Sequence, residues 1–379
     1  MVAVGCFVWF VAACLWTVNA LRRPVSPGAR FPPLWLPGMI VSELAPWYLV
    51  ARGLIAWAFV AAGALEVRIG QMGIALFVLS ELGLLVLIGR SVRAARYAGQ
   101  RPGVLELLRV TRRLPEGVTL TRELPYWEGF TLDAYRLSTV TAAPALVYLH
   151  PGSWMRGRPG RQALHLFYQL AATGWVILDI RYPLSPRATF PEHVIGVKRA
   201  IAWAKDGGGA LGIDPANVAI AGASSGAHLA ALAALTWDHA DLQPGFERAD
   251  TSVIACVPHY GIYDLLLRNA TRYDWPFIAQ HVMKARPEEA PDLYRLGSPL
   301  DLVRPDAPPF LVIHGEYDSA VLAGESRHLV EALRSCGAPV EYHEVAGAQH
   351  GFDAIASVRT RAVGDLVAAF LRRVVRTRA

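Results

Sequence analysis

The chain has 379 residues, of which 53% are hydrophobic, so it can bury a large core and is not a disordered protein. Its formal net charge of +6 resides in residues 1–103, which contain nine arginines, no lysine and three glutamates. Residues 104–379 carry 28 basic and 28 acidic residues and are neutral. Because a neutral folded region offers no basic patch, nucleic acid is not an expected partner.

Three apolar runs occur early in the chain, at residues 2–20, 49–65 and 72–88. The first run has no charged residue and is long enough to cross a bilayer as a helix, whereas the other two are near the short limit for a span. Five of the 11 tryptophans lie in residues 1–103, several near the ends of the runs, which is typical of membrane interfaces. We predict that residues 1–103 form a membrane module of about three transmembrane helices embedded in a lipid bilayer.

The arginines of this module flank the apolar runs asymmetrically. Four arginines follow the first run and four follow the third, whereas the turn between the second and third runs is neutral overall. Since positively charged flanks remain in the cytoplasm, three spans place residues 104–379 on the cytoplasmic side. Two alternatives would change the topology: a signal peptide cleaved near residues 18–20, and a shorter run that lies in the interface instead of crossing.

One carboxylate, that of Glu81, lies within the third run, where charge is costly. If the second and third runs form a hairpin, Glu81 lies opposite residues of the second run that are one helical turn from Arg52. We expect Glu81 either to form an ion pair with Arg52 that joins the hairpin or to be protonated, rather than to line a transport pathway.

Residues 104–379 change pattern, because short β-type runs alternate with helical ones. The expected strands are residues 118–124, 130–137, 144–150, 174–180, 217–222, 252–261, 309–315 and 340–346. Strands that alternate with helices predict an α/β fold, a doubly wound and mostly parallel sheet covered on both faces. The carboxyl ends of such strands are where ligands and chemistry collect.

The pentapeptide GASSG (residues 222–226) follows an expected strand and opens an expected helix. This is the setting of the nucleophile elbow G-x-S-x-G, in which a serine occupies a strained turn between glycines. Ser224 is the serine framed by the glycines, so we predict Ser224 as a nucleophile. An ordinary turn between a strand and a helix is the alternative.

A serine hydroxyl needs a base and a third group that orients the base. Asp318 follows the strand PFLVIHG, and His350 follows the strand VEYHEVA, so both lie at carboxyl ends and come in the order serine, acid, histidine. We predict Asp318 as the acid and His350 as the base. Glu316 and His343 are the nearest alternatives, but His343 lies within a strand.

The loop after residues 144–150 reads HPGSW and consists mostly of small residues. Acyl transfer creates an oxyanion that backbone amides can stabilise. We predict that the amides of Gly152, Ser153 and Ser225 form this oxyanion hole. Trp154 either lines a substrate pocket or packs beneath the loop.

Five segments together, HPGSW, DIRYPLSPRATFPEHV, GASSGAHLAALAALT, GEYDS and GAQHGF, resemble the α/β-hydrolase esterases and lipases related to hormone-sensitive lipase. The chain is most similar to the membrane-anchored bacterial carboxylesterases of that group and shares its plan with isoprenylcysteine methylesterases. The resemblance implies the triad and oxyanion roles above and no cofactor or metal. The basic flanks of the apolar runs suit an anionic inner leaflet, so we expect a location in the bacterial inner membrane. Pro151 departs from the usual H-G-G pattern, which should stiffen the loop without removing its donors.

The sequence therefore predicts a membrane-anchored serine carboxylesterase or lipase that acts on a small-molecule or lipid ester through an acyl-enzyme. Residues 104–379 form the predicted catalytic domain, and an insertion near residues 262–298 forms a lid or pocket wall. Tyr263, Trp275 and Phe277 of this insertion are possible pocket residues. The alternatives are a catalytically silent binding protein of the same fold and a serine peptidase.

Overall fold

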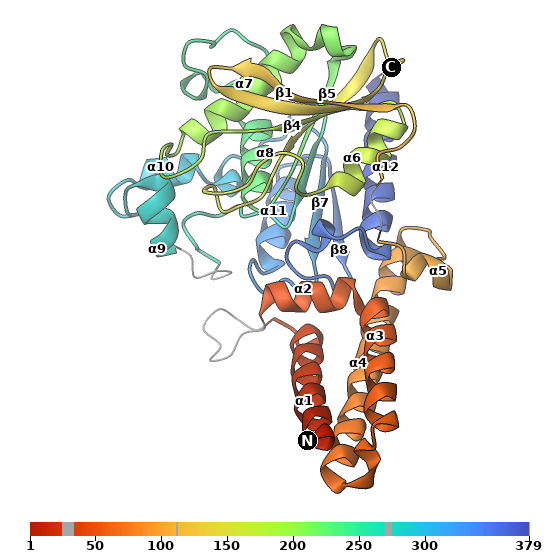
Figure 1. Ribbon diagram of the computed structural model, residues 1–379. Helices are drawn as coiled ribbons and strands as arrows, with labels where there is room; N and C mark the ends of the chain where they lie inside the picture. The colour runs from red at the N-terminus through yellow and green to blue at the C-terminus, as the bar shows by residue number, and fades with distance from the viewer. Residues whose placement is uncertain (25–33, 111–112, 270–274, 379) are drawn as a thin grey trace. The chain divides into compact units, whose positions relative to one another are not determined.

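The computed structural model describes residues 1–24, 34–110, 113–269 and 275–378, with the side chain of Trp275 outside the description (Figure 1). The chain forms two compact units. The first, here called the helical unit, comprises residues 1–111, 315–320 and 345–363. The second, here called the sheet unit, comprises residues 112–314, 321–344 and 364–379.

Five helices form the first part of the helical unit. They are α1 (Val2–Leu21), α2 (Trp35–Glu43), α3 (Ala45–Ala61), α4 (Arg68–Tyr97) and α5 (Val104–Leu107). Figure 1 shows α1, α3 and α4 side by side, and α1 packs closely on α4. A Cβ atom at Gly73 of α4 would lie 2.9 Å from Sγ of Cys6, and one at Gly83 would lie 2.5 Å from Cγ2 of Thr17. These glycines therefore allow the close packing that is typical of helices in membranes.

Two of these helices, α1 and α4, are long and apolar enough to cross a membrane. A third span is present only if α2 and α3 are counted as one bent span, since the two helices meet at an angle of 81°. The second predicted run was displaced: α3 covers Ala45–Ala61 rather than residues 49–65. Pro46 in the first turn favours the earlier start, and Gly63, with a φ of 84°, follows the end of the helix.

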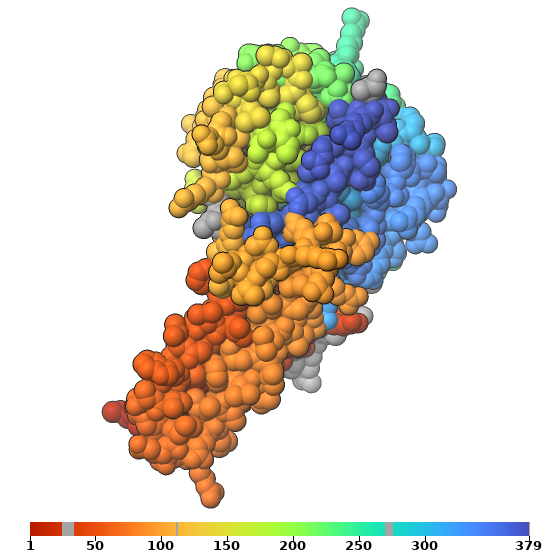
Figure 2. Space-filling view, turned by 90° about the vertical axis from the view of Figure 1, so that its right-hand side faces the viewer, coloured from red at the N-terminus to blue at the C-terminus, as the bar shows by residue number. Residues whose placement is uncertain are grey.

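The surface of α1, α3 and α4 is largely apolar. Figure 2 shows the part of it that α3 and α4 form, in orange. The exposed large side chains of the three helices include Val8, Trp9, Leu15, Trp16, Val50, Leu54, Trp57, Met72, Leu79, Leu82 and Leu85. Apolar side chains on an outward surface are expected where lipid replaces water as the solvent.

Arg52 joins the three long helices in a way that the sequence analysis did not anticipate. Its guanidinium donates hydrogen bonds to Oγ1 of Thr17 in α1, at 2.8 Å, and to Oγ of Ser80 in α4. Among the described residues, no ion pair joins Arg52 to Glu81. Of the two states expected for Glu81, the ion pair is therefore not found, because Ser80, the neighbour of Glu81, is the residue that faces Arg52.

The sheet unit contains an eight-stranded sheet in the order β1-β2-β4-β3-β5-β6-β7-β8. The strands are β1 (Val118–Trp127), β2 (Phe130–Leu137), β3 (Ala143–Leu149), β4 (Val176–Ile180), β5 (Ile213–Ala223), β6 (Cys256–His259), β7 (Phe310–Gly315) and β8 (Val340–Val345). The pairs β1 with β2 and β2 with β4 are antiparallel, whereas β4, β3, β5, β6 and β7 are paired in parallel. The predicted α/β architecture with a mostly parallel sheet is confirmed.

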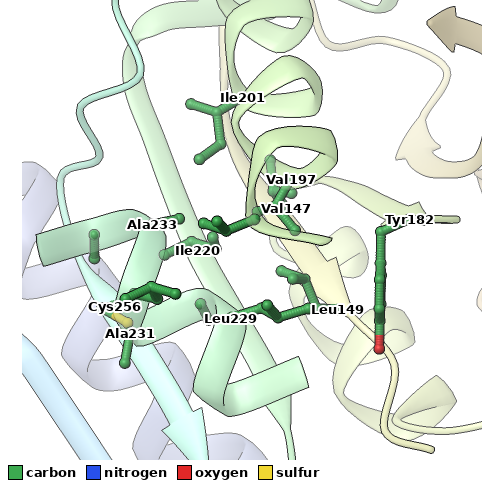
Figure 3. Close-up of a cluster of buried hydrophobic side chains, with 14 of the residues drawn as sticks. Val147, Leu149, Tyr182, Val197, Ile201, Ile220, Leu229, Ala231, Ala233 and Cys256 are labelled. Atoms are coloured by element: carbon green, nitrogen blue, oxygen red, sulfur yellow. The ribbon is translucent and has the colours of Figure 1, made fainter. Parts of the chain in front are cut away.

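Helices cover both faces of this sheet (Figure 1). The covering helices are α6 (Leu164–Ala172), α7 (Glu192–Asp206), α8 (Ser225–Leu235), α11 (Gly324–Ser335) and α12 (Val358–Arg378), whereas α9 (Trp275–Phe277) and α10 (Pro291–Leu296) belong to the insertion. Figure 3 shows the core on one face, where Val147 of β3 and Ile220 of β5 meet Val197 of α7 and Leu229 of α8. Tyr148 of β3 points to the opposite face and packs edge-on against Phe167 of α6.

Candidate active site

Ser224 occupies the turn between β5 and α8. Its backbone is at φ 52° and ψ −120°, a conformation that costs a non-glycine residue about 1–3 kcal/mol. The turn is held because the amide of Ser224 donates to the carbonyl of His259 at 2.9 Å. Strain of this kind at a serine between a strand and a helix is the geometry that the nucleophile elbow requires.

The two glycines of the pentapeptide are required by close backbone packing. A Cβ atom at Gly222 would lie 2.4 Å from the carbonyl oxygen of Gly226, and one at Gly226 would lie 2.2 Å from the carbonyl oxygen of Leu149. Real Cβ atoms do not approach oxygen so closely, so neither position accepts a side chain without a backbone shift. The second contact also places the elbow against the end of β3, from which the predicted oxyanion loop starts.

The predicted oxyanion loop has an unusual backbone. Gly152, Ser153 and Trp154 follow one another with φ values of 143°, 55° and 59°. A Cβ atom at Gly152 would lie 2.0 Å from the carbonyl oxygen of Arg156, so only glycine fits there. Ser225 is the first residue of α8, where backbone amides have no acceptor within the helix. The loop and the helix start thus both carry amides in conformations suited to binding an anion.

His150 braces the start of this loop. Its ring stacks on Tyr182 at a centroid distance of 4.4 Å, and the Tyr182 hydroxyl donates to the His150 carbonyl at 2.7 Å. Its Nδ1 lies 3.0 Å from the carbonyl of Pro151, which can only accept, so Nδ1 carries the proton. Burial lowers the pKa of His150 to about 4, so the ring is neutral at pH 7. His150 therefore supports the loop.

Trp154 is buried beneath the loop. Its indole N–H donates to Nδ1 of His228 at 3.1 Å, and Nε2 of His228 donates to the carbonyl of Gly297 at 2.7 Å. These two hydrogen bonds tie the loop after β3 to α8 and to the end of the insertion. Of the two roles considered for Trp154, packing is the one that its contacts support.

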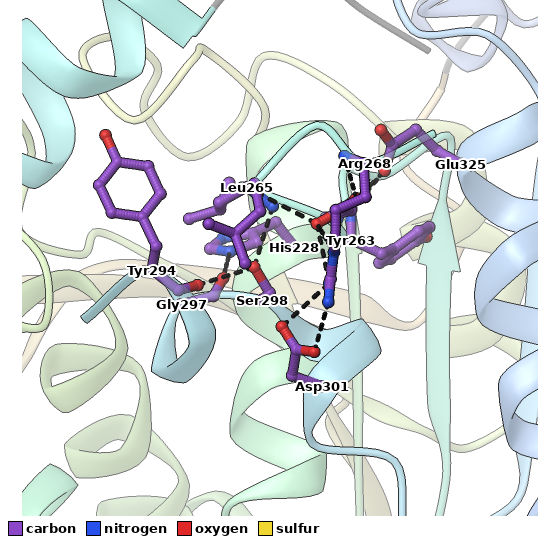
Figure 4. Close-up of polar contacts among 11 residues, drawn as sticks. His228, Tyr263, Leu265, Arg268, Tyr294, Gly297, Ser298, Asp301 and Glu325 are labelled. Carbon is purple, nitrogen blue, oxygen red and sulfur yellow. Dashed lines mark hydrogen bonds and ion pairs between the residues drawn. The ribbon is translucent and has the colours of Figure 1, made fainter. Parts of the chain in front are cut away.

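The insertion is anchored to the sheet unit at its base, as Figure 4 shows. The backbone amide of Tyr263 donates to Glu325 at 2.8 Å, and the amide of Leu265 donates to Oγ of Ser298 at 3.0 Å. Arg268 binds Asp301 at 2.7 Å. The Tyr263 side chain is buried within the hydrophobic core, so its contacts favour packing over lining an open pocket.

The other two predicted pocket residues lie farther along the insertion. Phe277 is half-buried and its ring lies 5.1 Å from that of His281. The side chain of Trp275 lies outside the described residues.

One cavity of the sheet unit, of about 600 Å³, lies elsewhere, between the predicted oxyanion loop and the antiparallel strands. Its lining includes His150, Tyr182, Trp127, Phe130 and Arg181, and none of the predicted pocket residues.

Asp318 and His350, which follow β7 and β8, meet in the helical unit. Nδ1 of His350 lies 2.7 Å from Oδ2 of Asp318, and the Asp318 side chain is fully buried. Oδ1 of Asp318 accepts from the amide of Ala320 at 2.9 Å. With the carboxylate accepting at Nδ1, the neutral imidazole keeps a lone pair on Nε2, which is the state of a general base.

The alternative acid and base, and a further histidine at the end of β7, have other surroundings. Glu316 accepts from the amide of Gly347 at 2.9 Å. His314 is bound by Oγ of Ser326 at 2.7 Å and by the carbonyl of Val321 at 2.9 Å. His343 lies within β8 and is buried. These contacts are those of structural residues, so Asp318 and His350 stay the preferred pair.

Sequence reasoning missed two residues of the helical unit beside this pair. Gln349 accepts hydrogen bonds from the amide and hydroxyl of Ser319, both at 3.2 Å, and so links the two loops. The ring of Trp35 in α2 lies 5.5 Å from that of His350, at an interplanar angle of 82°. No local pattern connects residue 35 with residue 350, although Gln349 could have been noticed as a polar neighbour of the base.

Comparison with known proteins identifies a family for this chain. The BD-FAE family matches residues 132–333. The chain belongs to the BD-FAE family. It is 40% identical over 282 residues to the esterase LipQ of Mycobacterium tuberculosis, and 38% identical over 282 residues to LipM of the same organism, a probable carboxylic ester hydrolase. The two matches cover 72% and 73% of this chain and 67% and 65% of the relatives, so the chain matches about two thirds of their length.

Solved structures show the same fold. A truncated carbohydrate esterase from gut microbiota superposes with a TM-score of 0.60 at 24% identity, over 69% of this chain and 98% of the other. At this level of identity the likeness concerns the fold alone. Together with the relatives, it confirms the predicted membership of the α/β-hydrolase esterases related to hormone-sensitive lipase.

Proposed function

We propose that this protein is a membrane-anchored serine carboxylesterase or lipase that hydrolyses small-molecule or lipid esters. The conformation of Ser224, a strained non-glycine residue at the tip of β5, is the observation that carries the proposal. The hydrogen bond between His350 and Asp318 supports it, because it supplies a base in the required tautomer. The relatives that are esterases support ester hydrolysis as the activity.

In the proposed reaction, Oγ of Ser224 attacks the ester carbonyl while Nε2 of His350 accepts the hydroxyl proton. Asp318 stabilises the imidazolium through Nδ1. The amides of Gly152, Ser153 and Ser225 stabilise the tetrahedral oxyanion, and removal of one such donor typically costs about 100-fold to 1,000-fold in rate. The imidazolium then gives its proton to the leaving alcohol, and a water molecule activated by His350 releases the acid from Ser224.

The experiment is to label the purified full chain in detergent with a fluorophosphonate probe and to measure hydrolysis of p-nitrophenyl esters. Wild type should be labelled, and Ser224→Ala should lose both labelling and at least about 1,000-fold of the rate. Ser138→Ala, which removes an exposed hydroxyl of the sheet unit, is the matched control and should match wild type. A folded wild type without labelling would contradict the proposal and favour a catalytically silent binding protein.

For the location, we propose the bacterial inner membrane, with the sheet unit in the cytoplasm. The proposal is supported by the apolar α1 and α4 and by the arginines at their carboxyl ends. Arg23 and Arg90 both lie against the ring of Tyr317, at 5.9 Å and 4.4 Å, so the two arginine clusters share one end of the helical unit. A cationic end of this kind suits an anionic inner leaflet.

A further inference from the structure

The helix α2 lies against the two loops that carry Asp318 and His350. The ring of Trp35 meets that of His350 edge to face, at 5.5 Å. A Cβ atom at Gly351, the next residue, would lie 3.8 Å from the same indole. A Cβ atom at Gly38, one turn along α2, would lie 3.4 Å from Nε2 of Gln349. The start of α2 therefore contacts the loop of the predicted base on both sides of His350.

Both ends of α2 are fixed within the helical unit. At its start, the side chain of Asn19 accepts from the Leu34 amide at 2.7 Å and donates to the Leu34 carbonyl at 2.9 Å. At its end, Glu43 forms a buried ion pair with Arg359 and accepts from Oγ of Ser357 at 2.6 Å. Because α2 is held at both ends, it keeps the Trp35 side chain in a defined position against His350.

The residues at the start of α2 are also exposed and apolar. Leu34, Trp35 and Leu36 have 57%, 39% and 47% of their surface exposed, although all three are large hydrophobic residues. His350 beside them is largely buried. An exposed apolar segment that touches a buried imidazole is suited to an apolar part of a substrate that must reach this imidazole.

We propose that Trp35 is a positioning residue for His350 and that the segment Leu34–Leu36 borders the path of lipophilic acyl chains to this base. The proposal rests on the proposed esterase function. His350 must keep Nδ1 on Asp318 while Nε2 is aligned to take and return the proton, and rotation about the side chain would lose both alignments. The indole, 5.5 Å from the imidazole, restricts that rotation. The helical unit then supplies both the predicted base and the residue that positions it.

The experiment compares Trp35→Ala, Trp35→Phe and Trp35→Leu in the full chain in detergent, with p-nitrophenyl acetate and p-nitrophenyl decanoate as substrates. The concentration of active sites is determined by labelling each sample to completion with a fluorophosphonate. Each rate is divided by this concentration, so that unfolded protein is excluded. We expect Trp35→Ala and Trp35→Leu to lower kcat for the acetate by about 10-fold to 100-fold with little change in KM. Trp35→Phe keeps a ring and should restore kcat. For the decanoate, KM should rise in Trp35→Ala as well.

Trp57→Ala, which removes an exposed tryptophan of α3, is the matched control and should retain both constants. Because Leu keeps apolar volume and Phe keeps the ring, equal kcat values for Trp35→Leu and Trp35→Phe would overturn the positioning role. Equal KM values for the decanoate in wild type and Trp35→Ala would overturn the role in acyl binding. A wild type that is neither labelled nor active would instead overturn the proposed function, so the two failures are distinguishable.

Discussion

The buried carboxyl of Asp179 in β4 contributes to the pH dependence of stability. Its Oδ2 accepts from the Gly160 amide at 2.7 Å, and burial raises the pKa of Asp179 to about 8, with the nearby Asp133 adding to the increase. The pKa in the unfolded chain is about 3.9. Between these values the folded state binds a proton that the unfolded state has lost, so the free energy of unfolding falls by up to about 1.4 kcal/mol per pH unit as pH rises.

We predict that Asp179→Asn removes this contribution, because the amide stays neutral. The Tm of the variant, measured by thermal unfolding between about pH 5 and about pH 8, should fall less with pH than that of wild type. Asp292→Asn, at an exposed carboxylate of α10, should follow wild type. Parallel curves for Asp179→Asn and wild type would contradict the assigned protonation state.

The element α2 depends on the pair of Glu43 and Arg359, whose side chains are both fully buried. Removing one partner of a buried pair leaves an uncompensated charge and costs about 3–5 kcal/mol. We predict that Glu43→Gln lowers the Tm of the full chain in detergent and the fraction that a fluorophosphonate labels. The reason is that α2 would lose its attachment to the segment that follows His350.

Two further variants test this explanation. Glu66→Gln, at an exposed carboxylate of the helical unit, should leave the Tm unchanged. Replacing both partners with apolar residues, Glu43→Leu with Arg359→Met, should recover much of the loss, because no buried charge is left alone. A Tm of Glu43→Gln equal to that of wild type would contradict a structural role of the pair.

The topology of the whole molecule is tested by cysteine accessibility. Arg68 at the start of α4 and Arg101 after its end are both exposed, and three spans place them on opposite sides of the membrane. We predict that a membrane-impermeant maleimide labels Arg68→Cys in intact cells and labels Arg101→Cys only after permeabilisation. Wild type gives the background of the four native cysteines. The reverse pattern would place the sheet unit outside the cytoplasm.

Local pattern accounted for much of the fold. The strand-turn-helix context of GASSG, the alternation of strands and helices, and the position of Asp318 and His350 after two strands are all readable over a few neighbouring residues. The helix α2 was missed, since Pro37 and Gly38 in WLPGMIVSE are typical of loops. The structure accommodates Pro37 in the first turn, where no hydrogen bond is lost, and uses the missing side chain of Gly38 to approach Gln349.

The sequence alone determined the fold class, the order of the predicted triad and the apolar runs, because periodicity and turn chemistry act between near neighbours in the chain. Tertiary structure alone decided that Trp35 meets His350, that Arg52 bonds to Thr17 and Ser80 rather than pairing with Glu81, and that Asp179 is buried enough to hold its proton. These features depend on contacts between distant segments and on exclusion of water, and neither is encoded in any single stretch of residues.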